Sequence, residues 1–466
     1  MFIYRSTVPA ALVFSLLFNV AVQAQSVTPA MQARAVQLAE QALDDTLGYE
    51  LVEALTTEVG PRLAGTEAEA RAREWAVKRL RGLGFSNVRV EPFEIPVWRR
   101  GVERAEILAP YPQPLVVTAL GGSVATGPEG VEADIAAYPD LAALQAAPGE
   151  TVRGRIVFVD EVMTRTQDGS GYSVAAGKRR QAAYIAQEKG ALAVLIRSVG
   201  TSSHRFAHTG QMRRLTESGS EGVPAAALSA PDADQLRRIL QRNGSARVRL
   251  VLTPESRPAG RSGNVIAEIP GNEAPQEIVL IGAHLDSWDM GTGAVDDGAG
   301  VGIVIAAAKR LMDLQPEGPR RTVRVVLFGA EEVGLVGARV YAEAYADTLD
   351  DHVIASESDF GAGRIWRFET RAGEDRIESA LALGAGVRAL GAANGGNTAS
   401  GGPDMTYVRE AGVPVVSLRQ NGWDYFDLHH TPNDTLDKID PDDIAHNVAA
   451  WLSFIFLAAN SGDTYR

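Results

Sequence analysis

The chain has no cysteine among its 466 residues, which excludes disulfide bonds and thiolate metal ligands. Its stability must therefore come from a packed core, together with any metal held by nitrogen and oxygen ligands. Basic residues are also in the minority, because 45 lysines and arginines stand against 58 acidic residues and leave a formal net charge of −13. No extended basic run could neutralise a line of phosphates, so we expect no nucleic-acid partner.

Apolar runs long enough to approach a membrane span occur only at the N-terminus. Arg5, an apolar stretch from Val8 to Val22 and small residues ending at Ala24 are typical of a secretory signal peptide in residues 1–24. A membrane anchor is the alternative, but the run is shorter than the about 20 residues that a spanning helix needs. We therefore expect no stable membrane insertion after cleavage. The lack of disulfides favours the bacterial periplasm or the medium, so we expect a secreted or periplasmic protein.

The remaining chain has the composition of a folded globular protein, with 45% hydrophobic and 22% charged residues. Three-and-four spacing of apolar residues predicts helices between Thr28 and Leu83, and an alternating edge strand follows from Asn87 to Ile95. Residues 98–258 contain short strands, small residues and loops. This change of texture predicts an inserted domain that is small and either α/β or β-rich.

From Gly263 onward, strands alternate with longer helices. The strands are predicted at residues 276–282, 322–328 and 352–356, and the helices at residues 298–314, 335–345 and 444–459. Such alternation is typical of an α/β fold with a mainly parallel central sheet flanked by helices. We therefore expect residues 25–97 and 259–466 to form the N-terminal part and the main part of one domain, with the insert in residues 98–258.

The strand-end loops of this last region carry residue types that bind metals. In chain order, these residues are His284 and Asp286, Asp296 and Asp297, Glu331 and Glu332, Glu357 and Asp359, and His429 and His430. Ligands of open α/β folds bind where the carboxyl ends of parallel strands meet. The chain has only 7 histidines, so a consecutive pair at such a position is notable.

Each motif alone also has a plain structural explanation. Asp296 and Asp297 could be the N-terminal acids of the helix that follows them. Glu331 and Glu332 could form a solvated turn, and either histidine of the pair at 429–430 could cap a helix or pack. The recurrence of these residue types at successive strand ends makes coincidence a poor explanation. Adjacent glutamates point in different directions, so one can bind a metal while the other acts as a general base.

The number of candidate ligands fits two metal ions. Two histidines, one shared aspartate and two further carboxylates would give each ion a histidine, a terminal carboxylate and one oxygen of the bridge, with room for a shared water. That arrangement is typical of hydrolytic sites. Nitrogen and carboxylate ligands without thiolates favour two Zn²⁺ per chain, with Co²⁺ or Mn²⁺ as substitutes, whereas Ca²⁺ and Mg²⁺ rarely recruit two imidazoles.

These motifs, in this order, resemble those of the co-catalytic di-zinc exopeptidases, the family of bacterial leucine-type aminopeptidases and plasma glutamate carboxypeptidase, also called carboxypeptidase Q. The similarity covers roughly residues 263–462, and the segment HHTPNDTLDKID at 429–440 is more similar to carboxypeptidase Q than to the minimal aminopeptidases. The resemblance implies a zinc exopeptidase fold of the phosphorylase/hydrolase-like type. It also places residues 98–258 where some members carry a protease-associated domain, and it is the sole ground for expecting a homodimer.

The resemblance implies a division of the ligands between the two metals. One metal would be held by His284, Asp296 and Asp359. The other would be held by Asp296, Glu332 and His430. Asp296 would therefore bridge the two ions.

Three supporting roles follow from the same resemblance. Asp286 would hydrogen-bond to His284 and orient it, and the peptide bond from Asp296 to Asp297 would be cis. Glu331 would be the general base, taking a proton from the bridging water as it attacks the scissile carbonyl and passing it to the leaving amine. The metals would polarise the carbonyl and stabilise the oxyanion.

The expected substrate is a short peptide that loses single residues, or a dipeptide. Tyr425 or His429 could contact it rather than only pack, and the Gly-rich segment 395–403 before Asp404 could either wrap a small ligand or open a helix. Recognition of a free amino terminus would need an acidic partner, and recognition of a free carboxylate an arginine or lysine. The sequence offers both, so the recognised terminus stays open.

Two other functions compete with the peptidase. One is a glutaminyl-cyclase-like enzyme that uses a single zinc on a related fold, and the other is a non-catalytic binding module that keeps the fold. The complete set of two histidines and three carboxylate ligands argues against both.

Overall fold

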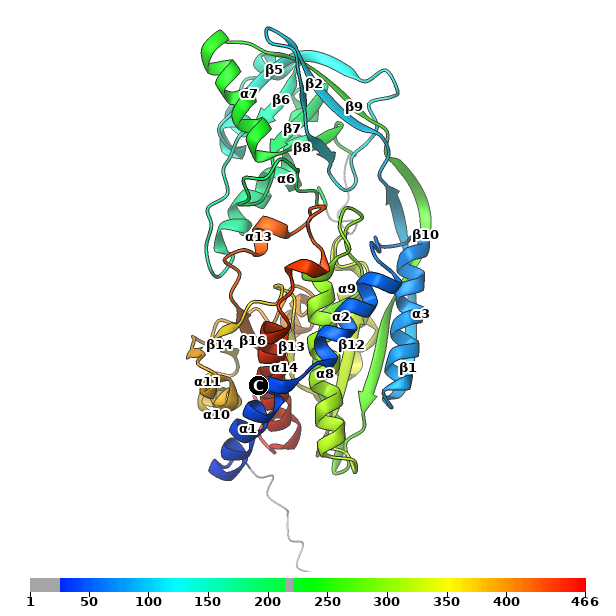
Figure 1. The fold of residues 1–466 in the computed structure, drawn as a ribbon, viewed down its shortest axis with the longest axis vertical. Coiled ribbons are helices and arrows are strands. Elements are labelled where there is room, and N and C mark those ends of the chain that lie inside the picture. Colours follow the sequence, from blue (N-terminus) through cyan, green and yellow to red (C-terminus); the bar gives the residue numbers. More distant parts are fainter. Residues whose placement is uncertain (1–25, 214–220) are drawn as a thin grey trace, which may run out of the picture.

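The computed structural model describes residues 26–213 and 221–466. The predicted signal peptide, residues 1–24, lies outside the described residues. Two eight-stranded sheets, each covered by helices, lie one above the other along the long axis of the molecule (Figure 1). Within the described residues, no helix combines the length and the apolar character that crossing a membrane requires.

The lower sheet holds the strands predicted after Gly263. Its spatial order is β1 (Ser86–Arg99), β10 (Glu255–Ile269), β12 (Arg321–Phe328), β11 (Ala274–His284), β13 (His352–Glu357), β16 (Val415–Gln420), β14 (Ile365–Arg371) and β15 (Ala393–Asn394). The central strands β12, β11, β13 and β16 are mutually parallel. The predicted α/β class with a largely parallel centre is therefore confirmed.

Antiparallel pairings occur on both sides of this parallel centre. β1 pairs antiparallel with β10, β10 with β12, and β14 with β16. The first pairing has a topological reason, because β1 carries the chain toward the upper sheet and β10 brings it back (Figure 1). The strand expected at Asn87–Ile95 lies at the sheet edge, as its alternating pattern predicts.

Helices cover both faces of the lower sheet. Successive residues of a strand point to opposite faces. Accordingly, Val279 and Ile281 of β11 join the core cluster under one helical layer, whereas Leu280 joins the cluster under the other. The first layer contains α2 (Leu47–Glu58), α3 (Glu67–Gly82), α8 (Ala299–Leu314) and α14 (Pro441–Asn460), with α1 (Pro29–Gln41) and α11 (Ala385–Ala389) packed on α14, and the second contains α9 (Val336–Ala344) and α12 (Thr406–Glu410).

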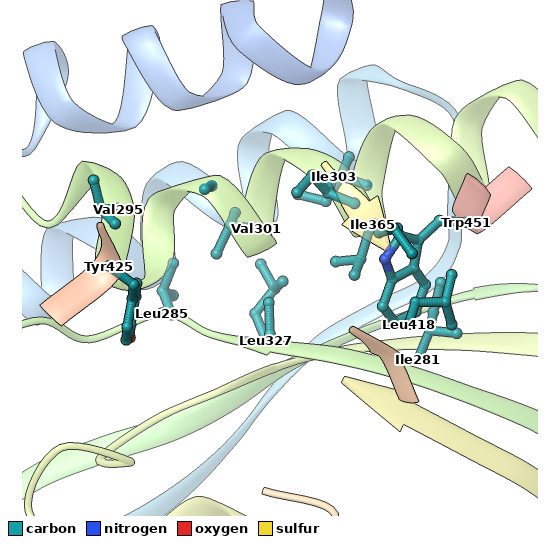
Figure 2. Packing of buried hydrophobic residues seen from close by; sticks show 14 of the residues in the cluster. Ile281, Leu285, Val295, Val301, Ile303, Leu327, Ile365, Leu418, Tyr425 and Trp451 are labelled. Carbon is teal, nitrogen blue, oxygen red and sulfur yellow. The ribbon is translucent and has the colours of Figure 1, made fainter. Parts of the chain in front are cut away.

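The centre of the first layer is the contact between α8 and the sheet (Figure 2). Val301 and Ile303 of α8 lie over Ile281 and Leu327 of the central strands, and all four side chains are fully buried. Fully burying an aliphatic side chain of this size contributes about 1.5–3 kcal/mol. The packing fixes α8 against the strand ends, and with it the loop that precedes the helix.

The upper sheet is built from the segment between β1 and β10. Its order is β3 (Gln113–Leu115), β2 (Glu103–Ala109), β9 (Arg247–Leu252), β5 (Val131–Tyr138), β6 (Ile156–Val159), β7 (Ala193–Arg197), β8 (Ala225–Leu228) and β4 (Val117–Ala119). Helix α6 (Ser170–Glu188) packs on one face and α7 (Ala230–Asn243) on the other. All eight strands lie inside residues 98–258, and the division of the chain into domains stays a prediction.

Candidate metal centre

The candidate ligands gather at the carboxyl end of the four parallel strands. β11 ends at His284, Glu332 follows β12, Asp359 follows β13, and His430 follows β16. β12 and β13 flank β11 on opposite sides, so the chain reverses its direction across the sheet at β11. Such a switch point is where open α/β sheets bind ligands, because the loops diverge there and leave a crevice.

Asp296 occupies the middle of this cluster. It lies in the short helical segment η2 (Ala294–Gly298), immediately before α8. Its Oδ1 is 3.1 Å from Nε2 of His284, and its Oδ2 is 3.3 Å from Nε2 of His430. His284 Nε2 is also 3.6 Å from Oδ1 of Asp359, and His430 Nε2 is 3.0 Å from Oε2 of Glu332. One carboxylate therefore faces both histidines, and each histidine faces one further carboxylate.

Two neighbours of the candidate ligands lie almost as close. Asp297, joined to Asp296 by the expected cis peptide bond, accepts hydrogen bonds from the backbone N–H of His284 and of Gly300, each at 3.1 Å. Its carboxylate is therefore committed to the backbone at the start of α8. His429 Nε2 lies 3.6 Å from Asp296 Oδ2. Only His430 contacts both Asp296 and Glu332, which favours His430 as the ligand.

The outer nitrogen of each candidate histidine is held by a backbone carbonyl. Nδ1 of His284 donates to the carbonyl of Asp286 at 2.9 Å, and Nδ1 of His430 donates to the carbonyl of Thr209 at 3.2 Å. In a neutral imidazole, a proton on Nδ1 leaves Nε2 as a bare acceptor. With neutral imidazoles, both Nε2 atoms would face carboxylate oxygens acceptor to acceptor, so each contact requires either a second ring proton or a metal ion.

The role of Asp286 differs from the expectation. Its carboxylate lies 3.9 Å from Nδ1 of His284, too far for a hydrogen bond, and the backbone carbonyl makes that contact instead. The carboxylate accepts hydrogen bonds from the backbone N–H of Glu331 at 3.0 Å and of Glu332 at 3.4 Å. Asp286 therefore orients His284 through its main chain, while its side chain fixes the loop that carries the glutamate pair.

The two adjacent glutamates make different contacts. Glu332 is buried, and its Oε1 accepts a hydrogen bond from the backbone N–H of Trp288 at 3.2 Å while its Oε2 faces His430. Both glutamates line the same cavity, but no histidine of the described ranges lies in ion-pair contact with the carboxylate of Glu331. Among the described residues, none donates a hydrogen bond to its carboxylate, so this group is free to act on a bound molecule.

The pKa shifts in the cluster show that its carboxylates stabilise positive charge on the two histidines. Burial lowers the pKa of His284, but the carboxylates of Asp296 and Asp359 outweigh it and raise the pKa well above its ordinary value. Burial likewise lowers the pKa of His430, and Glu332 and Asp296 raise it further than burial lowers it. Burial raises the pKa of Glu331 well above its ordinary value, with a contribution from the nearby acidic side chains.

The cavity over the cluster has a volume of about 390 Å³ and lies between the two sheets. The lower part of its wall includes Glu331, Asp359 and Tyr425. The upper part comes from the segment between β1 and β10, and it consists of Gly169, Tyr172, Arg179, Arg180, Gln211 and Met212. A cavity of this size suits a small ligand such as a short peptide. The upper segment thus completes the site. The spacing of apolar residues within this segment does not predict that contribution.

The three predicted substrate contacts differ in their positions. Tyr425 and His429 line the cavity. Asp404 is 1% exposed and lies behind Glu357, whose Oε2 accepts a hydrogen bond from the backbone N–H of Asp404 at 2.7 Å. Asp404 is not among the residues that line the cavity, whereas its neighbour Gly402 is. A substrate can therefore reach the first two side chains directly, but not Asp404.

Asp434 supports the site, although no sequence pattern predicted a role for it. Its Oδ1 accepts a hydrogen bond from the backbone N–H of Val295 at 2.6 Å, and its Oδ2 from that of Asp296 at 3.3 Å. It thereby links the loop after β16 to the segment that carries the central carboxylate. Its place in the HHTPNDT motif, four residues after His430, is the signal that could have identified it.

Arg62 is a second supporting residue without a predicted role. Its side chain is 0% exposed, and its guanidinium donates to the carbonyls of Leu285 at 2.5 Å, Thr292 at 2.7 Å and Gly293 at 2.9 Å. Burial lowers the pKa of Arg62, and the carboxylate of Asp434 opposes this effect. The residue ties together the loop between β11 and η2, which leads to Asp296.

Replacing Arg62 with methionine is expected to destabilise the protein by about 3–5 kcal/mol, because it leaves several buried carbonyls without donors. The free energy of unfolding from urea denaturation measures the change. Arg99→Met, at an exposed position of β1, is the control and should stay within about 0.5 kcal/mol of the natural chain. Equal stability of the two variants would show that Arg62 does not hold the loop.

The cluster fits a metal centre on the chemistry of its own donors. Oδ2 of Asp296 is buried and accepts no hydrogen bond from the described residues. Ligands bound to one zinc at about 2.0–2.2 Å lie roughly 3–3.5 Å apart, which matches the separations between the histidine nitrogens and the carboxylate oxygens. Imidazole and carboxylate donors without thiolates suit zinc. The residues present therefore fit the cofactor that the sequence predicts.

Comparison with known proteins gives results that agree with this geometry. The model of peptidase family M28 matches residues 264–455. Carboxypeptidase Q of Bos taurus is 33% identical over 416 residues, which cover 88% of this chain and 85% of that protein.

Solved structures extend the similarity to both sheets. The structure of a peptidase M28 precursor from Shewanella amazonensis is 50% identical, with a TM-score of 0.91, and the match covers 94% of this chain and 98% of that one. An aminopeptidase from Aneurinibacillus is 22% identical with a TM-score of 0.64, covering 92% of this chain and 97% of that one, and it shares the fold.

Proposed function

The chain belongs to peptidase family M28 and is a metallopeptidase. We propose that it is a secreted or periplasmic exopeptidase that binds two zinc ions and hydrolyses short peptides or dipeptides. The position of Asp296 carries the proposal, since its two oxygens lie 3.1 Å and 3.3 Å from the Nε2 atoms of two different histidines. A single-metal site has no use for a carboxylate shared in this way. The predicted signal peptide supports export, and the predicted homodimer stays an expectation.

The distances support the two ligand sets that the resemblance implies. His284, Asp296 and Asp359 would hold one zinc, and Asp296, Glu332 and His430 the other. When bound, the zinc ions supply Lewis-acid polarisation of the scissile carbonyl and acidify water.

The protein residues supply the proton transfers and the orientation. Glu331 faces the cavity without a hydrogen bond from the described residues, so its carboxylate accepts a proton from the attacking water and delivers it to the leaving amine. The carboxylate of Asp286 accepts hydrogen bonds from the backbone N–H groups of Glu331 and Glu332, which holds the base in a constant position relative to the ligands. The walls of the cavity limit the substrate to a short peptide.

Removal of metal should abolish hydrolysis of a dipeptide panel, and zinc should restore it, because without the ions nothing would polarise the scissile carbonyl or acidify the attacking water. The measurement is elemental analysis of the purified protein together with activity before and after chelation. We expect close to two zinc ions per chain.

A value near one would favour the cyclase-like alternative with a single zinc. Two bound zinc ions without hydrolysis of any peptide in the panel would instead favour the non-catalytic binding module. Activity that persists after complete removal of metal would contradict both the proposed function and the ligand assignment.

A further inference from the structure

Arg179 is a buried cation in the wall of the cavity that the steps above do not use. The residue is 5% exposed, yet its Nε and Nη1 have no hydrogen-bond partner among the described residues. None of the described carboxylates forms an ion pair with it. A buried guanidinium without a counter-charge is costly, so these donors point to an anion that arrives with a ligand.

The third nitrogen holds the guanidinium in place. Nη2 donates to the hydroxyl of Tyr172 at 2.5 Å, and both residues belong to α6. The ring of Tyr172 stacks on Phe426 with a centroid separation of 4.7 Å, and it meets His429 edge-on. In Figure 1, α6 lies directly above α13 (Tyr425–Leu428), the helix that precedes the histidine pair. Arg179 is therefore preorganised against the lower part of the site.

Arg179 and the candidate ligand His430 both lie next to Gly210. A Cβ added there would lie 2.5 Å from Nη1 of Arg179 and 2.7 Å from Nδ1 of His430. The guanidinium thus lies beside the outer edge of this imidazole, while the inner nitrogen faces Asp296 and Glu332. A group bound by Arg179 is close to the reacting centre but outside the ligand cluster.

The three other cationic side chains in the cavity wall, Arg180, Arg409 and Arg419, are already engaged. Arg419 donates to Oε2 of Glu369 at 2.8 Å, and Arg409 donates to the carbonyl of Ser400 at 2.7 Å. The remaining charged groups near the cluster are mostly carboxylates, including Glu331, Asp359 and Glu357. An anionic part of a ligand is repelled from that side and attracted to Arg179.

We propose that Arg179 binds the free α-carboxylate of the peptide substrate, so that the bond cleaved is the one preceding the last residue. This inference rests on the proposed function and deepens it, because it names the recognised end of the substrate. The residue comes from the upper segment, which gives that segment a part in substrate selection. A guanidinium suits this task because it stays charged at every working pH and donates in fixed directions.

The test compares dipeptides that have a free carboxylate with the same dipeptides as C-terminal amides. The natural zinc-loaded chain should prefer the free acids in kcat/KM. Arg179→Gln should lower kcat/KM for the free acids by about 10- to 100-fold, the range expected for the loss of a charged hydrogen bond, and should change that for the amides by less than about 3-fold. Arg179→Lys keeps the charge but not the planar set of donors. Its kcat/KM for the free acids should lie between those of the natural chain and Arg179→Gln.

Arg238→Gln is the matched control, since this arginine is exposed on α7 and bonds to Gln235. It should leave both rates unchanged. Equal losses for acids and amides in Arg179→Gln would overturn the inference and indicate a role in packing. Equal hydrolysis of acids and amides by the natural chain would overturn it as well. If the natural chain cleaves neither, the proposed function itself fails and this inference falls with it.

Discussion

Replacing Glu331 with glutamine should lower kcat for peptide hydrolysis by about 10²- to 10⁴-fold, the usual contribution of a positioned general base. The amide cannot accept the proton of the attacking water, while it keeps the size of the side chain. The zinc content should stay that of the natural chain, because the carboxylate of Glu331 faces the cavity and Glu332 faces His430. Steady-state kinetics and elemental analysis on the same preparation measure both quantities.

Glu343→Gln is the control for this experiment, because Glu343 is an exposed residue of α9 that pairs with Arg339. It should change neither activity nor zinc content. If Glu331→Gln kept its activity, another group would have to be the base. If it lost zinc together with activity, Glu331 would be a ligand rather than a base.

A second large loss of activity is expected when Asp296 is replaced. Asp296→Asn should lower kcat/KM by at least about 10³-fold, because it removes several kcal/mol of metal-dependent charge stabilisation. It should also weaken both metal positions at once, since the two oxygens of Asp296 face His284 and His430. The measurement is zinc content by elemental analysis after dialysis against a weak chelator.

Asp359→Asn provides the comparison that identifies a shared ligand. Asp359 lies 3.6 Å from His284, and the pair of His430 and Glu332 at 3.0 Å does not involve it. This variant should therefore keep about one zinc ion per chain, whereas Asp296→Asn should keep fewer. Equal zinc contents in the two variants would falsify the bridging role of Asp296.

Much of the lower half of the molecule follows from local pattern. The three-and-four spacing and the apolar runs after Gly263 predicted β11, α8, β12, α9, β13 and α14 close to their observed bounds. β14, which lies between β16 and β15, was not predicted. Its pairing with β16 joins segments about 50 residues apart, such as Phe368 and Leu418, and no spacing within one segment encodes such a partner.

The metal cluster was accessible to sequence reasoning for a physical reason. Parallel strands that are neighbours in a sheet end at one edge, so ligand-type residues just after several strands converge there. His284, Glu332, Asp359 and His430 obey this rule. The roles of Asp286 and Asp434 did not follow from it, because both act through backbone groups of other loops.

The residue types at the strand ends, and hence a nitrogen and carboxylate site on an α/β sheet, could be read from the amino-acid sequence alone. How these residues meet depends on the three-dimensional packing: Asp296 faces two histidines, Thr209 orients His430, and Arg179 reaches the cavity. The reason is that periodicity reports the burial of a segment, whereas Thr209 and His430 are 221 residues apart and meet only when the two sheets pack together.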